Sequence, residues 1–289
     1  MIKFGITLPN YGPDAGRLSI IDTAVAAERL GFDSIWVTDH LALPVEDGDR
    51  FGHIYEAMTT LAFLGASTRQ IKLGFSTLVL PQRNPIEVAK QIATLDVLSG
   101  GRIIFTAGIG WSAGEYKNLG YEFKNRGKRM DEALRVLRTC WRGQTKVSFN
   151  GIYYQFQDMV FSPTPLQPGG PPLWVAGDSS IALRRAILLG DGWHPNASSA
   201  ARLKTQLENN RTLINNRPFT VAVRFRLDFE EKDSTVGGLT GSAQDIINTL
   251  KDYQDAGMQV ALINFSAKNQ NDRERAMRRF MQDIKPALV

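Results

Sequence analysis

The sequence predicts an α/β fold of the (β/α)8 TIM-barrel class with insertion segments, and two observations support this prediction. First, short apolar runs alternate with amphipathic segments, and the 289 residues hold eight such strand-and-helix units. Second, runs such as IIF at 103–105 and LWV at 173–175 are apolar at every position, which is typical of parallel strands covered on both faces. An open doubly wound sheet is the competing arrangement, and the count of eight units favours a closed barrel.

The first four units follow one another closely along the chain. We expect strands at 3–9, 34–38, 71–80 and 102–108, and helices at 18–30, 55–68 and 85–98. Gly31 follows the first helix, where a left-handed C-cap residue is wanted. The sequence SGG at 99–101 ends the third helix.

The alternation is looser after the fourth strand. A long helix is expected from about residue 126 to 142, and a β-hairpin insertion at 145–163 turns at Asn150-Gly151. The stretch 163–172, rich in Pro and Gly, is a connector. The remaining strands are expected at 172–176, 191–194, 220–229 and 259–265, and the remaining helices at 180–189, 200–214, 242–256 and 271–284. We therefore expect one barrel domain over residues 1–289.

Composition excludes several classes of function. The 34 basic and 29 acidic residues give a net charge of +5, but much of the excess lies in helical stretches that are typical of solvated faces, so no nucleic acid is expected as a partner. No apolar stretch reaches the roughly 18 residues that span a bilayer, so no membrane is expected either. The lone Cys140 and a start without a signal-peptide pattern indicate a cytoplasmic protein. The three histidines and the lack of metal-binding spacing indicate that no metal is bound.

Residues just after each strand are the candidates for chemistry, because active sites of such barrels lie at the carboxyl ends of the strands. Asp39 and His40 follow the second strand. A histidine can give or take a proton at cellular pH, and a neighbouring carboxylate can orient it. The alternative is a histidine that only makes hydrogen bonds in a loop. Its position at a strand end favours the functional interpretation.

Other strand ends carry small or aromatic residues. Gly108 and Gly110 leave room for a flat ligand beside the backbone, although position 113 is Ala and the pattern is therefore not a dinucleotide-binding GxGxxG. Gly177-Asp178-Ser179 leads into a helix, where it fits either a phosphate or ordinary capping. Trp111 and Trp174 either stack on a ligand ring or pack in the core, and Glu115 is either a site carboxylate or a first-turn helix residue. We assign Trp111, Glu115 and His194 to a candidate substrate pocket.

Nine motifs in a fixed order give the chain a family resemblance. They are ITLP (6–9), AERLGFDS (27–34), VTDH (37–40), LGFST (73–77), PQRNP (81–85), LDVLSGGR (95–102), GIGW (108–111), RGKRMDE (126–132) and GDGWHP (190–195). With these motifs the chain resembles the bacterial-luciferase-like flavin oxidoreductases, in particular the branch that uses the deazaflavin coenzyme F420. The resemblance spans almost the whole chain.

The resemblance implies a TIM barrel with an insertion that helps to cover the cofactor, and a homodimer. It also implies a bulge in the third strand, with a non-prolyl cis peptide bond at Ser76-Thr77 behind the ring of the cofactor. The implied cofactor-binding residues are Asp39, Ser76, Thr77, Gly108, Gly110, Ala176, Gly177, Asp178 and Ser179. Of these, Asp39 would contact the ring, and Gly177, Asp178 and Ser179 would hold the phosphate. His40 matches the base of sugar-phosphate-oxidising relatives.

These features lead to one main hypothesis and two alternatives. The main hypothesis is an oxidoreductase that moves a hydride between C5 of coenzyme F420 and a small organic substrate, with His40 as the proton donor or acceptor and Asp39 tuning it. One alternative is an FMN-dependent two-component monooxygenase of the luciferase type. The other is a non-catalytic flavin-binding protein, against which the strand-end residues Asp39, His40 and His194 argue. The family's basic sugar-phosphate cluster has no clear counterpart, so the substrate stays open.

Overall fold

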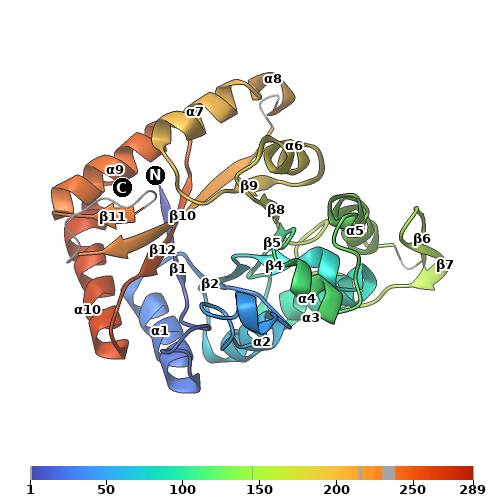
Figure 1. Cartoon of the computed structure of the whole chain (residues 1–289), viewed down its shortest axis with the longest axis horizontal. Coiled ribbons are helices and arrows are strands. Elements are labelled where there is room, and N and C mark those ends of the chain that lie inside the picture. The colour runs from blue at the N-terminus through green and yellow to red at the C-terminus, as the bar shows by residue number, and fades with distance from the viewer. Residues whose placement is uncertain (1, 145, 215–216, 230–237, 289) are drawn as a thin grey trace.

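The computed structural model describes residues 2–144, 146–214, 217–229 and 238–288. Within them, eight parallel strands form a closed barrel (Figure 1). The strands are β1 (Lys3–Thr7), β2 (Ser34–Val37), β3 (Lys72–Phe75), β5 (Ile103–Gly108), β8 (Leu173–Ala176), β9 (Gly192–His194), β10 (Thr220–Asp228) and β12 (Val260–Phe265). Pairing of β12 with β1 and of β9 with β10 completes the ring. The predicted (β/α)8 fold is confirmed.

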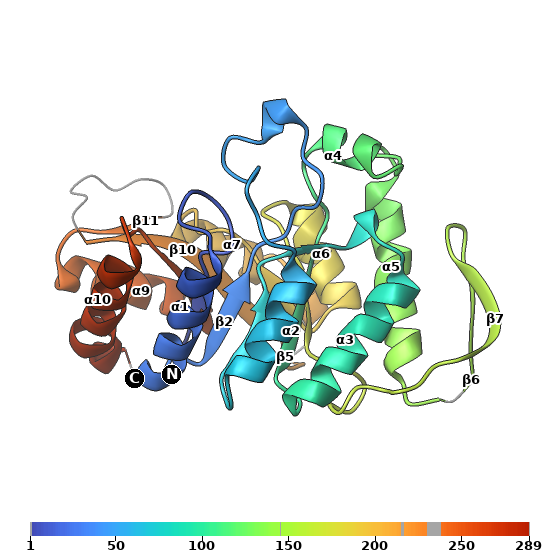
Figure 2. The ribbon, with the colours of Figure 1, turned by 90° about the horizontal axis from the view of Figure 1, so that it is seen from below.

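The helices lie outside the barrel: most surround its strands (Figure 1), and α4 (Ala113–Asn118) covers one end (Figure 2). The others are α1 (Arg17–Leu30), α2 (Ala57–Ser67), α3 (Pro85–Ser99), α5 (Arg126–Trp141), α6 (Ser180–Leu189), α7 (Ala200–Glu208), α8 (Arg211–Ile214), α9 (Ala243–Asp255) and α10 (Gln270–Arg279). Gly31 ends α1 in the left-handed region with φ 82°, as the sequence predicts. Inside the barrel, Trp174 stacks on Trp36 with ring centroids 5.3 Å apart, so Trp174 belongs to the core.

The third strand differs from the single run expected at 71–80. β3 ends at Phe75, the Ser76-Thr77 peptide bond is cis, and a two-residue strand β4 (Leu78–Val79) then pairs with β5. The cis bond implied by the family resemblance is therefore present. The helix expected at 200–214 is divided into α7 and α8, and a short strand β11 (Gly238–Thr240) beside β10 was not predicted.

The predicted hairpin insertion is present beside α5 (Figure 2). It consists of β6 (Lys146–Asn150) and β7 (Gln155–Val160), which pair antiparallel, while Thr145 lies outside the described residues. The turn is longer than the Asn150-Gly151 turn that we expected, because Asn150 pairs with Gln155 and leaves 151–154 as the loop. The carboxylate of Glu132 on α5 accepts the N–H groups of this loop, which explains the wider turn.

One end of the barrel is covered by the loop 41–56 and by α4 (Figure 2). Ser112, the N-cap of α4, donates its hydroxyl hydrogen to Asp47 of the loop. Asn118 at the other end of α4 donates to the carbonyl of Ala42. These contacts fix the loop above the carboxyl ends of β2 and β5. None of the helices within the described residues is long and apolar enough to cross a membrane.

Candidate functional site

A cavity of about 370 Å³ lies at the carboxyl ends of the strands. It gathers ten of the candidate residues from strands far apart in the sequence: Asp39, His40, Ser76, Thr77, Gly108, Gly110, Trp111, Ala176, Gly177 and His194. Its wall also contains residues that the sequence analysis did not select, namely Thr38, Phe51, Val79, Ile109, Asn196 and Arg224. Three candidates, Glu115, Asp178 and Ser179, are not part of the wall.

His40 follows β2 and is 6% exposed. Its Nδ1 lies 2.9 Å from Oε2 of Glu115, and a carboxylate oxygen accepts, so Nδ1 carries the proton. The ring packs against Trp111 and Phe51, with centroid separations of 5.6 and 4.9 Å. This arrangement assigns Nε2 to the cavity as the nitrogen that can accept or donate a proton.

Glu115 lies behind His40 and is fully buried. Its Oε2 also accepts from Nε2 of Gln82, and its Oε1 accepts the backbone N–H groups of Leu41 and Ala42. Burial by itself would raise the pKa of Glu115, but the hydrogen bonds from His40, Leu41 and Gln82 outweigh burial and lower the pKa to about 2. Glu115 is thus a carboxylate that orients His40. We expected Glu115 in the wall of the substrate pocket, but it lies behind His40 and does not line the cavity.

Asp39 has a partner other than His40. Its two carboxylate oxygens each lie 2.8 Å from a guanidinium nitrogen of Arg83, and Oδ2 also accepts the N–H of Val79 on β4. Burial raises the pKa of Asp39, against the opposing effect of Arg83. Asp39 and His40 are adjacent in sequence but bond in different directions. The carboxylate that contacts His40 is therefore Glu115, and Asp39 fixes the segment after the third strand.

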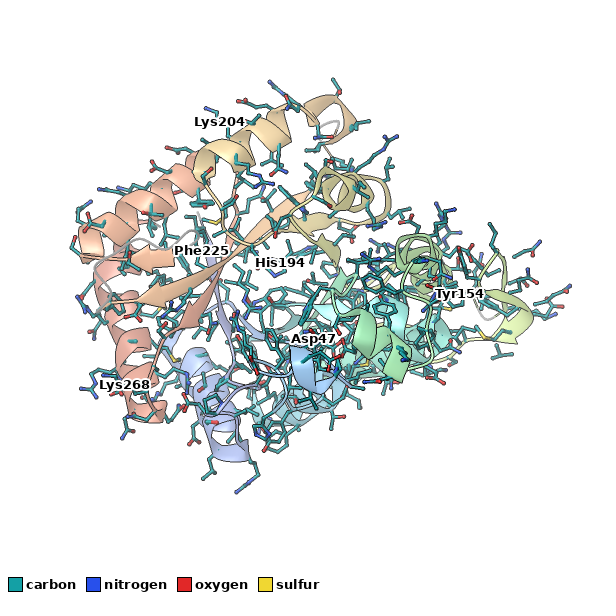
Figure 3. All side chains as sticks on the ribbon, viewed as in Figure 1. Asp47, Tyr154, His194, Lys204, Phe225 and Lys268 are labelled. Carbon is teal, nitrogen blue, oxygen red and sulfur yellow. The ribbon has the colours of Figure 1, made fainter. Side chains whose placement is uncertain are left out.

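His194 is the last residue of β9 and lies near the centre of the barrel (Figure 3). Its Nδ1 is 2.7 Å from the carbonyl oxygen of Ala222, so Nδ1 donates, and its Nε2 accepts from the hydroxyl of Ser76 at 2.9 Å. Burial, together with the nearby Arg224, lowers the pKa of His194 to about 4. His194 is neutral at pH 7 and holds Ser76 in place. A histidine that stays neutral is not evidence for proton transfer, so His194 does not argue against a non-catalytic flavin-binding protein.

Two glycines make the cavity wall beside β5. A Cβ on Gly108 would lie 2.1 Å from Oγ1 of Thr77, and a Cβ on Gly110, which has φ +72°, would lie 2.7 Å from Cγ1 of Val79. Only glycine fits at these positions, because the backbone runs directly against the segment after β3. On the same cavity, Thr38 is 6% exposed, and its Oγ1 has no hydrogen-bond partner in the part of the chain that the structure describes. A buried hydroxyl without a partner points to a ligand that supplies one.

The segment Gly177-Asp178-Ser179 leads into α6. Ser179 is the N-cap, and its Oγ accepts the N–H of Ala182 at 3.2 Å. Gly177 has φ +127° and lines the cavity. The structure therefore shows the helix capping that was one of the two interpretations of this segment. The Ser179 hydroxyl oxygen already accepts a hydrogen bond from the helix.

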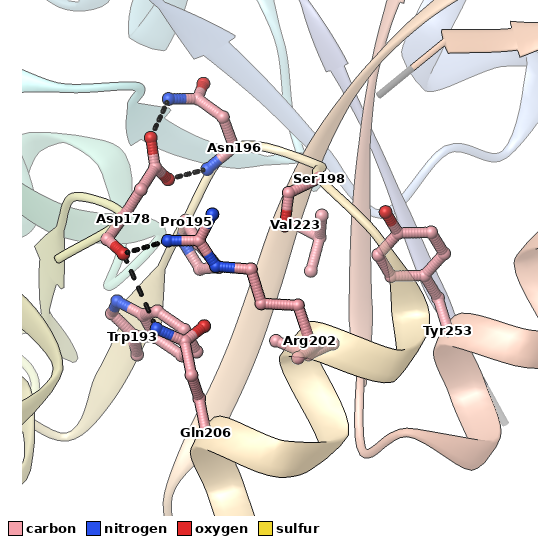
Figure 4. A pocket seen from close by; sticks show the side chains of 10 residues that line it. Asp178, Trp193, Pro195, Asn196, Ser198, Arg202, Gln206, Val223 and Tyr253 are labelled. Carbon is pink, nitrogen blue, oxygen red and sulfur yellow. Dashed lines mark hydrogen bonds between the residues drawn. The ribbon is translucent and has the colours of Figure 1, made fainter. Parts of the chain in front are cut away.

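The side chain of Asp178 is turned toward Asn196. Its carboxylate accepts hydrogen bonds from the backbone N–H of Asn196 at 2.8 Å and from Nδ2 of Asn196 at 3.2 Å. Its backbone carbonyl accepts hydrogen bonds from the side chains of Arg202 and Gln206 (Figure 4). The hollow between these residues measures about 10 Å³, which is room for one water molecule rather than for a ligand.

Arg224 is the cavity residue that the sequence analysis should have found. It stands in the strand sequence VAVRFRL at 221–227, where apolar residues alternate with charged ones. In a barrel strand such alternation places the charged side chains on the inner face. Within the described residues, no group of three or more His, Cys, Asp or Glu is arranged to hold a metal ion.

The sequence profile of luciferase-like monooxygenases matches residues 3–227. The chain belongs to this family. An F420-dependent glucose-6-phosphate dehydrogenase of Amycolatopsis mediterranei is 31% identical over 199 residues, which cover 67% of this chain and 57% of that relative. A protein of the same name from Intrasporangium calvum is 35% identical over 201 residues, with coverage of 67% and 57%. The chain thus spans less than two thirds of the length of these curated relatives.

Solved structures of the same fold cover the whole chain. Monooxygenase RslO1 from Streptomyces bottropensis superposes with a TM-score of 0.84 at 18% identity, and the match covers 100% of both chains. The coenzyme F420-dependent tetrahydromethanopterin reductase from Methanopyrus kandleri gives 0.82 at 19% identity, with coverage of 100% of this chain and 99% of that one. These likenesses establish the luciferase-like barrel fold.

Proposed function

We propose that this protein is an F420-dependent oxidoreductase that transfers a hydride between the deazaflavin and a small organic substrate. The observation that carries the proposal is the buried His40, which Glu115 holds through Nδ1 while Nε2 is left to the cavity beside Gly108 and Gly110. The names of two relatives with 31% and 35% identity support F420 as the cofactor.

The residues of the cavity fit a flat ring. A volume of about 370 Å³ is within the usual range of small-molecule sites. Gly108 and Gly110 line the cavity without side chains, with Thr77 and Val79 packed against them, and the Thr38 hydroxyl has no partner among the described residues. In this proposal Ser76, Thr77, Gly108, Gly110 and Ala176 hold the ring. The phosphate is held by the backbone at Gly177, Asp178 and Ser179, since the hydroxyl of Ser179 and the carboxylate of Asp178 have other partners.

The protein's own groups supply proton transfer and orientation. When bound, the deazaflavin supplies hydride transfer at its C5 position. His40 takes the proton of the substrate at Nε2 during oxidation and returns it during reduction. Glu115 keeps the second proton on Nδ1 and stabilises the imidazolium that results. Asp39, through Arg83 and Val79, holds the backbone that faces the ring. Trp111, which is 52% exposed at the edge of the cavity, shields the substrate pocket from water.

Fluorescence titration of the purified protein with oxidised F420, and separately with FMN, tests the proposal. We expect F420 to bind more tightly than FMN. The reverse order would contradict the proposal and favour a two-component FMN-dependent monooxygenase. Binding of neither would overturn the assignments at Ser76, Gly108 and Gly177. Steady-state turnover of bound F420 with a panel of alcohols and acceptors then distinguishes an enzyme from a non-catalytic binding protein.

We further propose a cytoplasmic homodimer. α2 and α3 expose Phe63, Val97 and Leu98 on one side of the barrel, and Leu98 is 79% exposed. The lone Cys140 is buried and fits a reducing compartment. Sedimentation equilibrium at micromolar concentration checks the dimer, and a monomer at all concentrations would contradict it.

A further inference from the structure

A second polar cluster lies beside Ser76 at the same cavity, and the proposed mechanism does not use it. Its centre is Arg224 of β10, which lines the cavity. The guanidinium donates through Nη1 to the carbonyl of Ser76 and through Nη2 to the hydroxyl oxygen of Tyr11, both at 3.1 Å. A guanidinium has five N–H donors, and the contacts to described residues account for two of them.

Tyr11, which follows β1, receives more donors than one phenol oxygen can satisfy. Its oxygen lies 3.1 Å from Arg224, 3.4 Å from Nδ2 of Asn264 and 3.5 Å from Nη2 of Arg50. A phenol oxygen has two lone pairs, so three N–H groups compete for it. The cluster therefore holds N–H groups that an additional acceptor could satisfy.

The cluster also carries positive charge without a matching carboxylate. No Asp or Glu among the described residues forms an ion pair with Arg224 or with Arg50. By contrast, Arg83 in the same region pairs with Asp39 through both of its terminal nitrogens, Nη1 and Nη2. Arg224 is half-buried, and a guanidinium partly withdrawn from water without an anion beside it is less favourable than a paired one, so an anionic ligand would reduce this cost.

The position of the cluster connects it to the proposed chemistry. Arg224, His40 and Phe51 line the same cavity. The Phe51 ring is 4.9 Å from the ring of His40 and 4.9 Å from the ring of Tyr11. Arg50 lies over Phe51 with its guanidinium carbon 5.1 Å from the ring centroid. A ligand that reaches from Arg224 toward His40 therefore stays inside one cavity.

We propose that Arg224 and Arg50 form an anion subsite, so that the substrate carries an anionic oxygen group, a carboxylate or a phosphate. That the bound anion is part of a substrate rests on the proposed function, whereas the anion subsite itself does not. A guanidinium binds the oxygens of either group through two parallel N–H donors, and Arg224 is oriented for this by Tyr11 and Ser76. Arg50 is exposed on the loop above the cavity and supplies a second cation from solvent.

Isothermal titration calorimetry with malonate and with inorganic phosphate tests the subsite. The proteins are the wild type, Arg224→Gln, Arg50→Gln and the control Arg135→Gln, which removes the same charge from an exposed position of α5. Each is titrated with and without bound F420, because the cofactor occupies any phosphate site of its own. We expect Arg224→Gln to weaken binding of at least one anion by about tenfold to a hundredfold. We expect Arg50→Gln to weaken it by about twofold to fivefold and Arg135→Gln to leave it unchanged.

The outcomes distinguish a failure of the anion subsite from a failure of F420 binding. Unchanged anion affinity in Arg224→Gln, or no binding of either anion to the wild type, overturns the subsite. Tighter binding of malonate than of phosphate assigns a carboxylate, and the reverse assigns a phosphate. If F420 does not bind but the anion effect of Arg224→Gln persists, the proposed function falls and the anion subsite stands. Should Arg224→Gln fail to fold by circular dichroism, Arg50→Gln decides, because its exposed side chain is not part of the core; unchanged affinity there counts against the subsite.

Discussion

The two sides of the cavity each carry a buried histidine at a strand end, and the two histidines have opposite surroundings. His40 is 6% exposed and His194 is 4% exposed. His40 faces the carboxylate of Glu115, whereas His194 lies between the carbonyl of Ala222 and the hydroxyl of Ser76. The two histidines thus agree in burial and position and differ in their partners. A carboxylate favours an imidazolium, whereas a carbonyl and a hydroxyl together hold one neutral tautomer. The proton-transfer role that we propose is therefore assigned to His40.

The same two sides differ in their charge balance. On the His40 side the carboxylates are matched, with Glu115 on His40 and Asp39 on Arg83. On the His194 side Arg224 has a carbonyl and a phenol oxygen as its partners. Proton transfer is therefore expected on one side of the cavity and anion binding on the other.

Replacing His40, the histidine with the carboxylate partner, should have the largest effect on turnover. We expect His40→Ala to lower turnover by about a hundredfold to ten-thousandfold, because general acid–base catalysis is lost. The F420 dissociation constant should stay within about threefold of the wild type, since the cavity backbone is unchanged. Steady-state absorbance of F420 gives the rate, and fluorescence titration gives the affinity.

The matched control is His53→Ala, which removes an exposed histidine from the loop above the cavity. It should turn over at nearly the wild-type rate. Equal turnover rates for the His40 and His53 variants would contradict the proton-transfer role proposed for His40.

Neutralising the partner should have the next largest effect. In Glu115→Gln the amide oxygen can still accept from Leu41 and Ala42, but the negative charge beside His40 is lost. We expect turnover to fall by about tenfold to a hundredfold, as for other residues that orient a catalytic group. The F420 dissociation constant should stay near the wild-type value. A fall in rate that is matched by an equal loss of F420 binding would reduce Glu115 to a structural role.

Replacing the other histidine should affect turnover least and stability instead. An unfolded histidine binds a proton below about pH 6.5, whereas folded His194 binds one only below about pH 4. The unfolded state therefore binds more protons between these values, and the wild type loses stability as the pH falls through this window, by roughly 3 kcal/mol. We expect His194→Asn to be less stable at pH 7.5 but to lose less stability between pH 6.5 and 4. Its turnover should fall by less than about tenfold.

Urea denaturation at pH 7.5, 5.5 and 4.5 measures this difference. The free energy of unfolding of wild type and variant should converge as the pH falls, because the group that is costly to protonate in the folded state has been removed. Parallel curves for the two proteins would contradict the neutral state assigned to His194.

Local features of the fold followed the sequence closely. Gly31 ends α1 in the left-handed region, and α6 spans Ser180–Leu189 as expected. Such features depend on neighbouring residues, which the sequence shows directly. The predictions that differed were those in which distant groups intervene. The loop at 151–154 is shaped by Glu132 of α5, and the third strand divides where Asp39 accepts the N–H of Val79.

The sequence by itself determined the barrel, the strand ends on which the site is built and, through its motifs, the family. Hydrophobic periodicity and turn residues act over a few positions, so they can be read without the fold. Only the tertiary structure decided which carboxylate contacts His40, that His194 is neutral, and that Arg224 lies on the same cavity. Glu115 is 75 residues from His40, and Arg224 is 148 residues from Ser76. Closure of the barrel brings these groups together, and burial then sets their charges, because the cost of desolvation depends on every neighbour at once.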